Sequence, residues 1–122
     1  LIKGAKVLIA ERKAHARLGG KWEFPGGKVE QDETPEACLK RELEEELGIY
    51  ATVGDYLGES MYQYDFGTVR ILFYRAFWDG KPIVSKDHED VKWVSMDQLD
   101  QYDFAPADIP FVEKLRSGAI AL

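Results

Sequence analysis

Residues 34–48 constrain the fold of this chain more than any other segment. They read TPEACLKRELEEELG, in which Thr34 followed by a proline is typical of a helix start and Gly48 is typical of a helix end. Leucines recur at every fourth position in between and form one apolar stripe. They are Leu39, Leu43 and Leu47. The segment therefore predicts a helix over residues 35–47 that packs against a core along this stripe.

The same helix carries an acidic cluster that needs a physical explanation. Glu42, Glu45 and Glu46 fall within about 100° of one another around the helix axis, beside the leucine stripe. Like charges at this spacing repel one another, and a cation between them would relieve the repulsion. Oxygen ligands of this kind favour Mg²⁺ or Mn²⁺ over zinc. The eight residues RELEEELG alone allow a solvated acidic face equally well, because glutamate is a good helix former.

Two neighbouring features favour a metal and phosphate site over a solvated face. Arg41 directly precedes Glu42, so its guanidinium can orient a ligating carboxylate. The tripeptide Pro25-Gly26-Gly27 is a strong turn signal. Bare backbone at such a turn can approach the helix and offer its N–H and C=O groups to phosphate or metal.

The rest of the chain predicts strands joined by turns, with further helices near the end. Residues 68–78 give the strongest strand pattern, and because both faces are mainly apolar we expect them to be covered on both sides. Residues 50–62 alternate loosely around glycines and predict a strand with a bulge or bend. Hairpins with helices on two sides predict an α+β fold, an α/β/α sandwich in one domain over residues 1–122. The other expected elements are strands at 5–11 and 91–95, a short extended piece at 22–24, loops at 12–21 and 83–90, and helices at 96–101 and 108–118.

Composition limits the classes of partner. The formal net charge is −6 and no basic patch is visible, which argues against binding to long nucleic acids. A nucleotide could still bind if metal ions neutralised the acidic cluster. No apolar run is long enough to span a membrane, and no signal peptide is expected. Cys38 is the single cysteine, so no internal disulfide can form, which favours a cytoplasmic location.

The segment from Gly27 to Ile49 resembles the signature of a known family. It reads Gly27, five residues, Glu33, seven residues, and then RELEEELGI over residues 41–49. This agrees with the Nudix box, G-x5-E-x7-R-E-U-x-E-E-x-G-U with U a bulky aliphatic residue, at every fixed position. The approach GKWEFPGGKVEQDETPE is similar to that of MutT-type enzymes, and FAPADIP at 104–110 resembles the corresponding segment of bacterial CTP pyrophosphohydrolases.

The resemblance implies the Nudix fold, with a mixed β-sheet between helices. Domains of this type normally carry a full strand before the segment GAKVLIAER at residues 4–12. Here only Leu1-Ile2 could be the end of that strand, so we expect the first strand to be truncated.

The resemblance also implies roles for the residues of the box. Arg41 would hold Glu42 in place. The ligands of one or more Mg²⁺ (alternatively Mn²⁺) would be Glu42, Glu45, Glu46 and the backbone carbonyl of Gly26. Structural roles would fall to Gly27, Glu33 and Gly48, with Glu33 joining the loop to the helix or taking part in an outer metal shell. The general base that activates water would be either Glu42 or Glu89, a loop carboxylate that could swing over the metal or simply be an exposed charge.

Substrate contacts are implied outside the box. Arg12 and Lys28 are candidates for binding phosphates. Asp108 would read the edge of the nucleobase, although an aspartate there could instead cap the last helix. Phe24 and Phe104 could enclose a base between their rings or belong to the core.

The implied activity is Mg²⁺-dependent hydrolysis of nucleoside triphosphates to nucleoside monophosphate and pyrophosphate. The substrates would be damaged or excess nucleotides, of the 8-oxo-dGTP or the CTP and modified dCTP type. One alternative is a hydrolase of nucleoside diphosphate derivatives such as ADP-ribose or of dinucleoside polyphosphates, although relatives of the ADP-ribose type often have a proline where this chain has Tyr64-Asp65-Phe66. Another is a non-catalytic nucleotide-binding module, which usually loses the box glutamates. We expect a cytoplasmic monomer or homodimer that binds nucleotides and neither nucleic acid polymers nor membranes.

Overall fold

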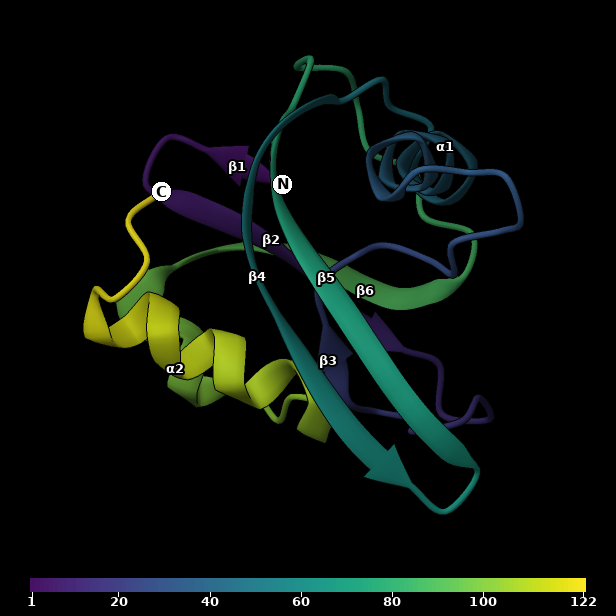
Figure 1. Ribbon diagram of the computed structural model, residues 1–122. Helices are drawn as coiled ribbons and strands as arrows, with labels where there is room; N and C mark the ends of the chain where they lie inside the picture. Colours follow the sequence, from purple (N-terminus) through teal and green to yellow (C-terminus); the bar gives the residue numbers. More distant parts are fainter.

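A mixed β-sheet lies between two helices in the computed structural model, which describes residues 1–122 (Figure 1). The strands are β1 (Ile2–Lys3), β2 (Lys6–Arg12), β3 (Trp22–Glu23), β4 (Thr52–Tyr64), β5 (Gly67–Phe77) and β6 (His88–Ser95). The helices are α1 (Pro35–Leu47) and α2 (Ile109–Ser117), with short 3₁₀ helices η1 (Met96–Gln101) and η2 (Pro106–Asp108). The expected α/β/α sandwich is confirmed.

The sheet is built around β2. Strand β6 pairs along one edge of β2, and the short strands β1 and β3 share its other edge at opposite ends. Strand β1 continues the sheet into β5 through a parallel pair, and β5 forms a long antiparallel hairpin with β4. Strand β3 pairs with β2 and not with β5. The sheet therefore opens between β3 and β5.

Alternate residues of β2 supply two separate cores. Val7 and Ile9 pack with the side chains of α2, while Leu8 between them packs with Leu43 and Leu47 of α1. All five side chains are nearly fully buried. Successive side chains of a strand point to opposite faces, so β2 joins the α1 layer to the α2 layer.

The predicted boundaries of α1 are confirmed at both ends. The Thr34 Oγ1 accepts a hydrogen bond from the Ala37 backbone N–H at 3.1 Å, which satisfies a donor in the first turn. Gly48 has φ +68° and donates its N–H to the Glu44 carbonyl at 2.9 Å, which ends the helix in a left-handed cap.

Several details of the other elements differ from expectation. Strand β5 is covered on both sides only in part: Phe73 packs in the core beside α2 and Ala76 in the core beside α1, while Phe77 at its end is 47% exposed. Strand β6 begins at His88 rather than at residue 91, because His88 already pairs with Arg12 of β2. The short helix after β6 is a 3₁₀ helix.

Two further expectations concern β4 and the start of the chain. The expected bulge in β4 is confirmed by shifts in its pairing register with β5 between Val53 and Gly58. At the start of the chain, the first strand, β1, contains only Ile2–Lys3.

None of the helices has the length and apolar character needed to cross a membrane.

Replacing Gly48 with alanine should lower the free energy of unfolding by about 1 kcal/mol, because alanine resists the positive φ that ends α1. Urea denaturation of wild type and Gly48→Ala measures this difference. The matched control is Glu44→Ala, an exposed position in the same last turn, which should change stability by less than about 0.5 kcal/mol. Equal stability of Gly48→Ala and wild type would contradict the assignment of Gly48 as the cap.

Candidate active site

Arg41 joins the loop before α1 to the helix itself. Its Nε and Nη2 donate to the two carboxylate oxygens of Glu33 at 2.7 and 2.9 Å, and its Nη1 donates to Glu42 at 2.7 Å. Glu33 also accepts a hydrogen bond from the Glu30 backbone N–H at 3.1 Å. These contacts lower the pKa of Glu33 to about 2, with the hydrogen bonds from Arg41 as the largest cause. The paired donors of a guanidinium match a carboxylate in shape, so this contact fixes orientation as well as distance.

The loop backbone approaches α1 closely at Gly27. A Cβ atom at this position would overlap the carboxylate of Glu42. A Cβ atom at Gly26 would meet only Leu39, at an ordinary distance of 4.0 Å. The Lys28 carbonyl accepts a hydrogen bond from Arg41 at 3.3 Å, which holds the loop in this position. Gly27 thus allows loop backbone and Glu42 to lie side by side.

The three glutamates of the acidic face have different surroundings. Glu45 is 60% exposed and contacts Arg41 at 3.2 Å, whereas Glu42 is 16% exposed and lies between Arg41 and Gly27. The Oε2 atom of Glu46 is buried and has no hydrogen-bond partner. Burial raises the pKa of Glu46 from its ordinary 4.5 to about 7. Their side chains do not converge on one point, and the structure contains no group of three acidic, His or Cys side chains in metal-binding geometry.

These surroundings fit a divalent cation beside α1. The unpaired buried oxygen of Glu46 lacks the positive partner that a buried carboxylate requires. Glu42 and the backbone freed by Gly27 offer further oxygen atoms nearby. A set made only of carboxylate and carbonyl oxygens is the type that Mg²⁺ and Mn²⁺ prefer.

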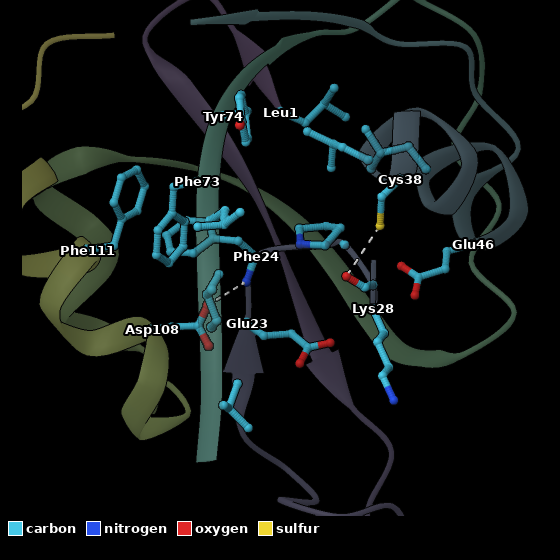
Figure 2. Close-up of a pocket in the computed structure, with 18 of the residues that line it drawn as sticks. Leu1, Glu23, Phe24, Lys28, Cys38, Glu46, Phe73, Tyr74, Asp108 and Phe111 are labelled. Carbon is cyan, nitrogen blue, oxygen red and sulfur yellow. Dashed lines mark hydrogen bonds between the residues drawn. The ribbon is translucent and has the colours of Figure 1, made fainter. Parts of the chain in front are cut away.

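A cavity of about 1100 Å³ occupies the opening between β3, β5 and α1. Figure 2 shows the Glu46 carboxylate projecting from α1 into the same space as the Glu23 carboxylate from β3. Lys28 lies at this end of the cavity, and its side chain is exposed. Phe24, Phe73, Phe111 and Asp108 line the other part. The cavity therefore combines a charged region with an aromatic region.

A partly buried chain of polar side chains borders the cavity and was not predicted from the sequence. Arg12 donates to Glu23 at 2.9 Å, and the other oxygen of Glu23 lies 3.1 Å from Nε2 of His88. The His88 side chain is 4% exposed, and its Nδ1 lies 3.2 Å from the Ser85 hydroxyl. The hydrogen bond with Glu23 raises the pKa of His88 above its ordinary value. Arg12, a candidate for phosphate binding, is thus paired with a carboxylate.

Asp108 is buried and does not cap α2. It occupies the position before the helix, but its carboxylate makes no capping hydrogen bond and instead accepts from the Phe24 N–H at 3.4 Å. Asp108 is 3% exposed, and burial raises its pKa from an ordinary 3.8 to about 7, with the charge of Glu23 as the next cause. The alternative role of Asp108 as a helix cap is therefore not realised.

Two expectations about other site residues need correction. The rings of Phe24 and Phe104 stack on each other with centroids 5.5 Å apart, so no base fits between them. Phe24 alone of the two lines the cavity. Glu89 does not lie on a mobile loop. It lies in β6 at a break in the pairing register opposite Arg12, is exposed, and is absent from the cavity lining, which includes its neighbours Asp87 and His88.

Comparison with known proteins places the chain in a family. A model of the NUDIX domain matches residues 1–115. The chain is 38% identical over 111 residues to the CTP pyrophosphohydrolase of Escherichia coli K12, covering 91% of this chain and 82% of the relative. It is 35% identical over 112 residues to the 8-oxo-dGTP diphosphatase of the same strain, covering 91% of this chain and 86% of the relative.

A solved structure agrees with this placement. The solution structure of the E. coli ORF135 protein superimposes with a TM-score of 0.82 at 37% identity, covering 98% of this chain and 88% of the other. The matched box, the cavity beside it and these relatives lead to one conclusion: the chain belongs to the Nudix family of hydrolases.

Proposed function

We propose that this protein hydrolyses nucleoside triphosphates to nucleoside monophosphate and pyrophosphate in the presence of Mg²⁺. The observation that carries the proposal is the single cavity that extends from the unpaired carboxylate of Glu46 to the buried carboxyl of Asp108. A nucleotide has two matching parts, a phosphate chain that needs cations and a flat base with a polar edge.

The charged part of the cavity would bind the triphosphate. Glu42, Glu45, Glu46 and the Gly26 carbonyl would hold Mg²⁺, with Arg41 keeping Glu42 and Glu45 in place. Bound Mg²⁺ supplies charge neutralisation for the phosphates and lowers the pKa of water. Lys28 offers a further positive charge at this end of the cavity. Mn²⁺ would fit the same oxygen ligands.

The residue that accepts a proton from water must lie in the cavity or directly beside its lining. Neither Glu42 nor Glu89 is among the residues that line the cavity, but the Glu42 carboxylate lies directly against Gly27, which does line it, while Glu89 lies in β6. We therefore propose Glu42 as the general base in addition to its part in metal binding. The attack would be on the β-phosphorus, which releases pyrophosphate.

The aromatic part of the cavity would bind the base. Phe24, Phe73 and Phe111 present apolar surface, and Asp108 supplies the polar group at its edge. With a pKa of about 7, Asp108 can accept a hydrogen bond or, when protonated, donate one. Two related proteins are named as a CTP pyrophosphohydrolase and an 8-oxo-dGTP diphosphatase. We propose that this protein hydrolyses one of these two types of nucleotide and so removes it from the nucleotide pool.

A turnover screen tests the proposed reaction. With Mg²⁺ and a panel that includes CTP, dCTP, 8-oxo-dGTP and ADP-ribose, we expect pyrophosphate release from a triphosphate, and ¹⁸O-labelled water should place the label in pyrophosphate. Glu45→Gln should lower turnover by about 10- to 100-fold. Glu44→Gln is the matched control, because Glu44 is exposed outside the acidic face. Cleavage of ADP-ribose alone would contradict the triphosphatase assignment, and binding without turnover would indicate a non-catalytic module.

Glu46→Gln should stabilise the metal-free protein and at the same time weaken its binding of Mg²⁺. The folded-state pKa of Glu46, about 7, lies above its ordinary 4.5, so ionisation of Glu46 destabilises the metal-free protein. The penalty is absent below about pH 4.5 and complete well above pH 7. At pH 8 without metal, Glu46→Gln should raise the free energy of unfolding by about 1 kcal/mol after allowance for solvent screening.

The same variant should lose stabilisation by Mg²⁺ and metal-dependent turnover. Thermal unfolding with and without Mg²⁺ measures the first effect, and Glu44→Gln again serves as the control. A Glu46→Gln protein that is stabilised by Mg²⁺ as strongly as wild type would show that Glu46 does not bind the metal.

Gly27→Ala should displace the Glu42 carboxylate and lower kcat/KM by about 100-fold, since small displacements of catalytic groups are costly. The comparison variant is Gly26→Ala, which keeps the backbone carbonyl and adds a methyl group near Leu39 only. We expect it to retain most of the activity. Steady-state kinetics on both variants would refute the close contact at Gly27 if the two behaved alike.

A further inference from the structure

The turn that carries Asp108 is held by two side chains of β4. Ser60 donates its hydroxyl to the Ala107 carbonyl, and the Ala107 N–H donates to the Tyr64 hydroxyl at 2.9 Å. Ser60 and Tyr64 are four residues apart on one strand, so their side chains lie on the same face. The backbone N–H and C=O of Ala107 are thus both bound by side chains from a distant part of the chain.

The same turn is tied to β3 from its other side. The Trp22 N–H donates to the Asp103 carbonyl at 2.8 Å, and the Ala105 N–H donates to the Trp22 carbonyl at 2.9 Å. Phe24 directly follows β3, and its N–H donates to the Asp108 carboxylate. Asp108 therefore depends for its position on contacts with both β3 and β4.

Tyr64 is fixed in place by neighbouring side chains. Its ring stacks on Phe66 with centroids 4.9 Å apart and an angle of 7°, and the Arg17 guanidinium covers Phe66 at 3.9 Å. Tyr64 also lines a hollow of about 270 Å³ that Asp108 and Arg12 border. Burial raises the pKa of Tyr64, so its hydroxyl keeps its proton at neutral pH.

We infer that Tyr64 and Ser60 are positioning residues that set the nucleobase preference of this protein by fixing Asp108 through the backbone N–H and C=O of Ala107. The inference rests on the proposed function, because it assigns these residues to the base end of the nucleotide cavity. Ala107 is 2% exposed, so loss of the Tyr64 hydroxyl would leave its N–H buried and unpaired. The turn would shift to satisfy that donor and would move the Asp108 carboxyl with it. A polar group that reads a base edge is sensitive to such a shift, whereas the metal end of the cavity is not.

The test compares Tyr64→Phe and Ser60→Ala with wild type in calorimetric binding of nucleoside monophosphates with different bases. Tyr64→Phe keeps the stacked ring and removes only the hydroxyl. We expect the ratio of the dissociation constant of the second-best base to that of the best base to fall by roughly 3- to 10-fold in each variant. Tyr56→Phe is the control, because Tyr56 is on the same strand, is 52% exposed and does not line either hollow.

Turnover of the corresponding triphosphates should show the same loss of preference, chiefly through KM, with kcat little changed. Equal weakening of all nucleotides, an unchanged preference, or a wild type with no base preference would each overturn the inference. If one of the two variants fails to fold, the other carries the test, since each removes one of the two hydrogen bonds to Ala107. Absence of turnover by wild type would refute the proposed function, while the binding ratios would still decide the role of Tyr64.

Discussion

The contact between Arg41 and Glu33 is the interaction on which the site depends. It ties the glycine loop to α1 and gives Arg41 a fixed direction from which it also reaches Glu42 and Glu45. One guanidinium cannot neutralise every carboxylate around it. Glu46 lies on the cavity side of α1 and is left with an unpaired buried oxygen. The protein fold thus concentrates negative charge that Arg41 compensates only in part, and a divalent cation would supply the remainder.

The opening in the sheet decides where the substrate can lie. Strand β3 is only two residues long and pairs with β2 alone, so β5 has no partner across the opening beyond its contact with β1. The side chains around this opening come from both layers of the sandwich, with Glu46 from α1 on one side and Asp108 before α2 on the other. A nucleotide in this cavity can therefore contact the α1 layer with its phosphates and the α2 layer with its base.

Local signals in the sequence predicted some parts of this arrangement and missed others. The limits of α1 follow from Thr34, Gly48 and the leucine stripe, all within one segment, and they were predicted correctly. The contact between Glu23 and His88 joins residues 65 positions apart through the pairing of both segments with β2, and no local periodicity reveals it. Residues 83–90 had no strand pattern, so the placement of Glu89 in β6 was missed. The contact of Tyr64 with Ala107 was missed because the two residues are also far apart in the sequence and Ala107 lies in a separate turn.

Anomalous scattering from Mn²⁺ tests the central claim most directly. Crystals grown with Mn²⁺ and a non-hydrolysable nucleoside triphosphate analogue should show a metal peak bonded to the Glu46 carboxylate, with Glu42 beside it and the contact between Arg41 and Glu33 retained. A peak elsewhere, or a Glu46 carboxylate that still lacks any partner, would contradict the account.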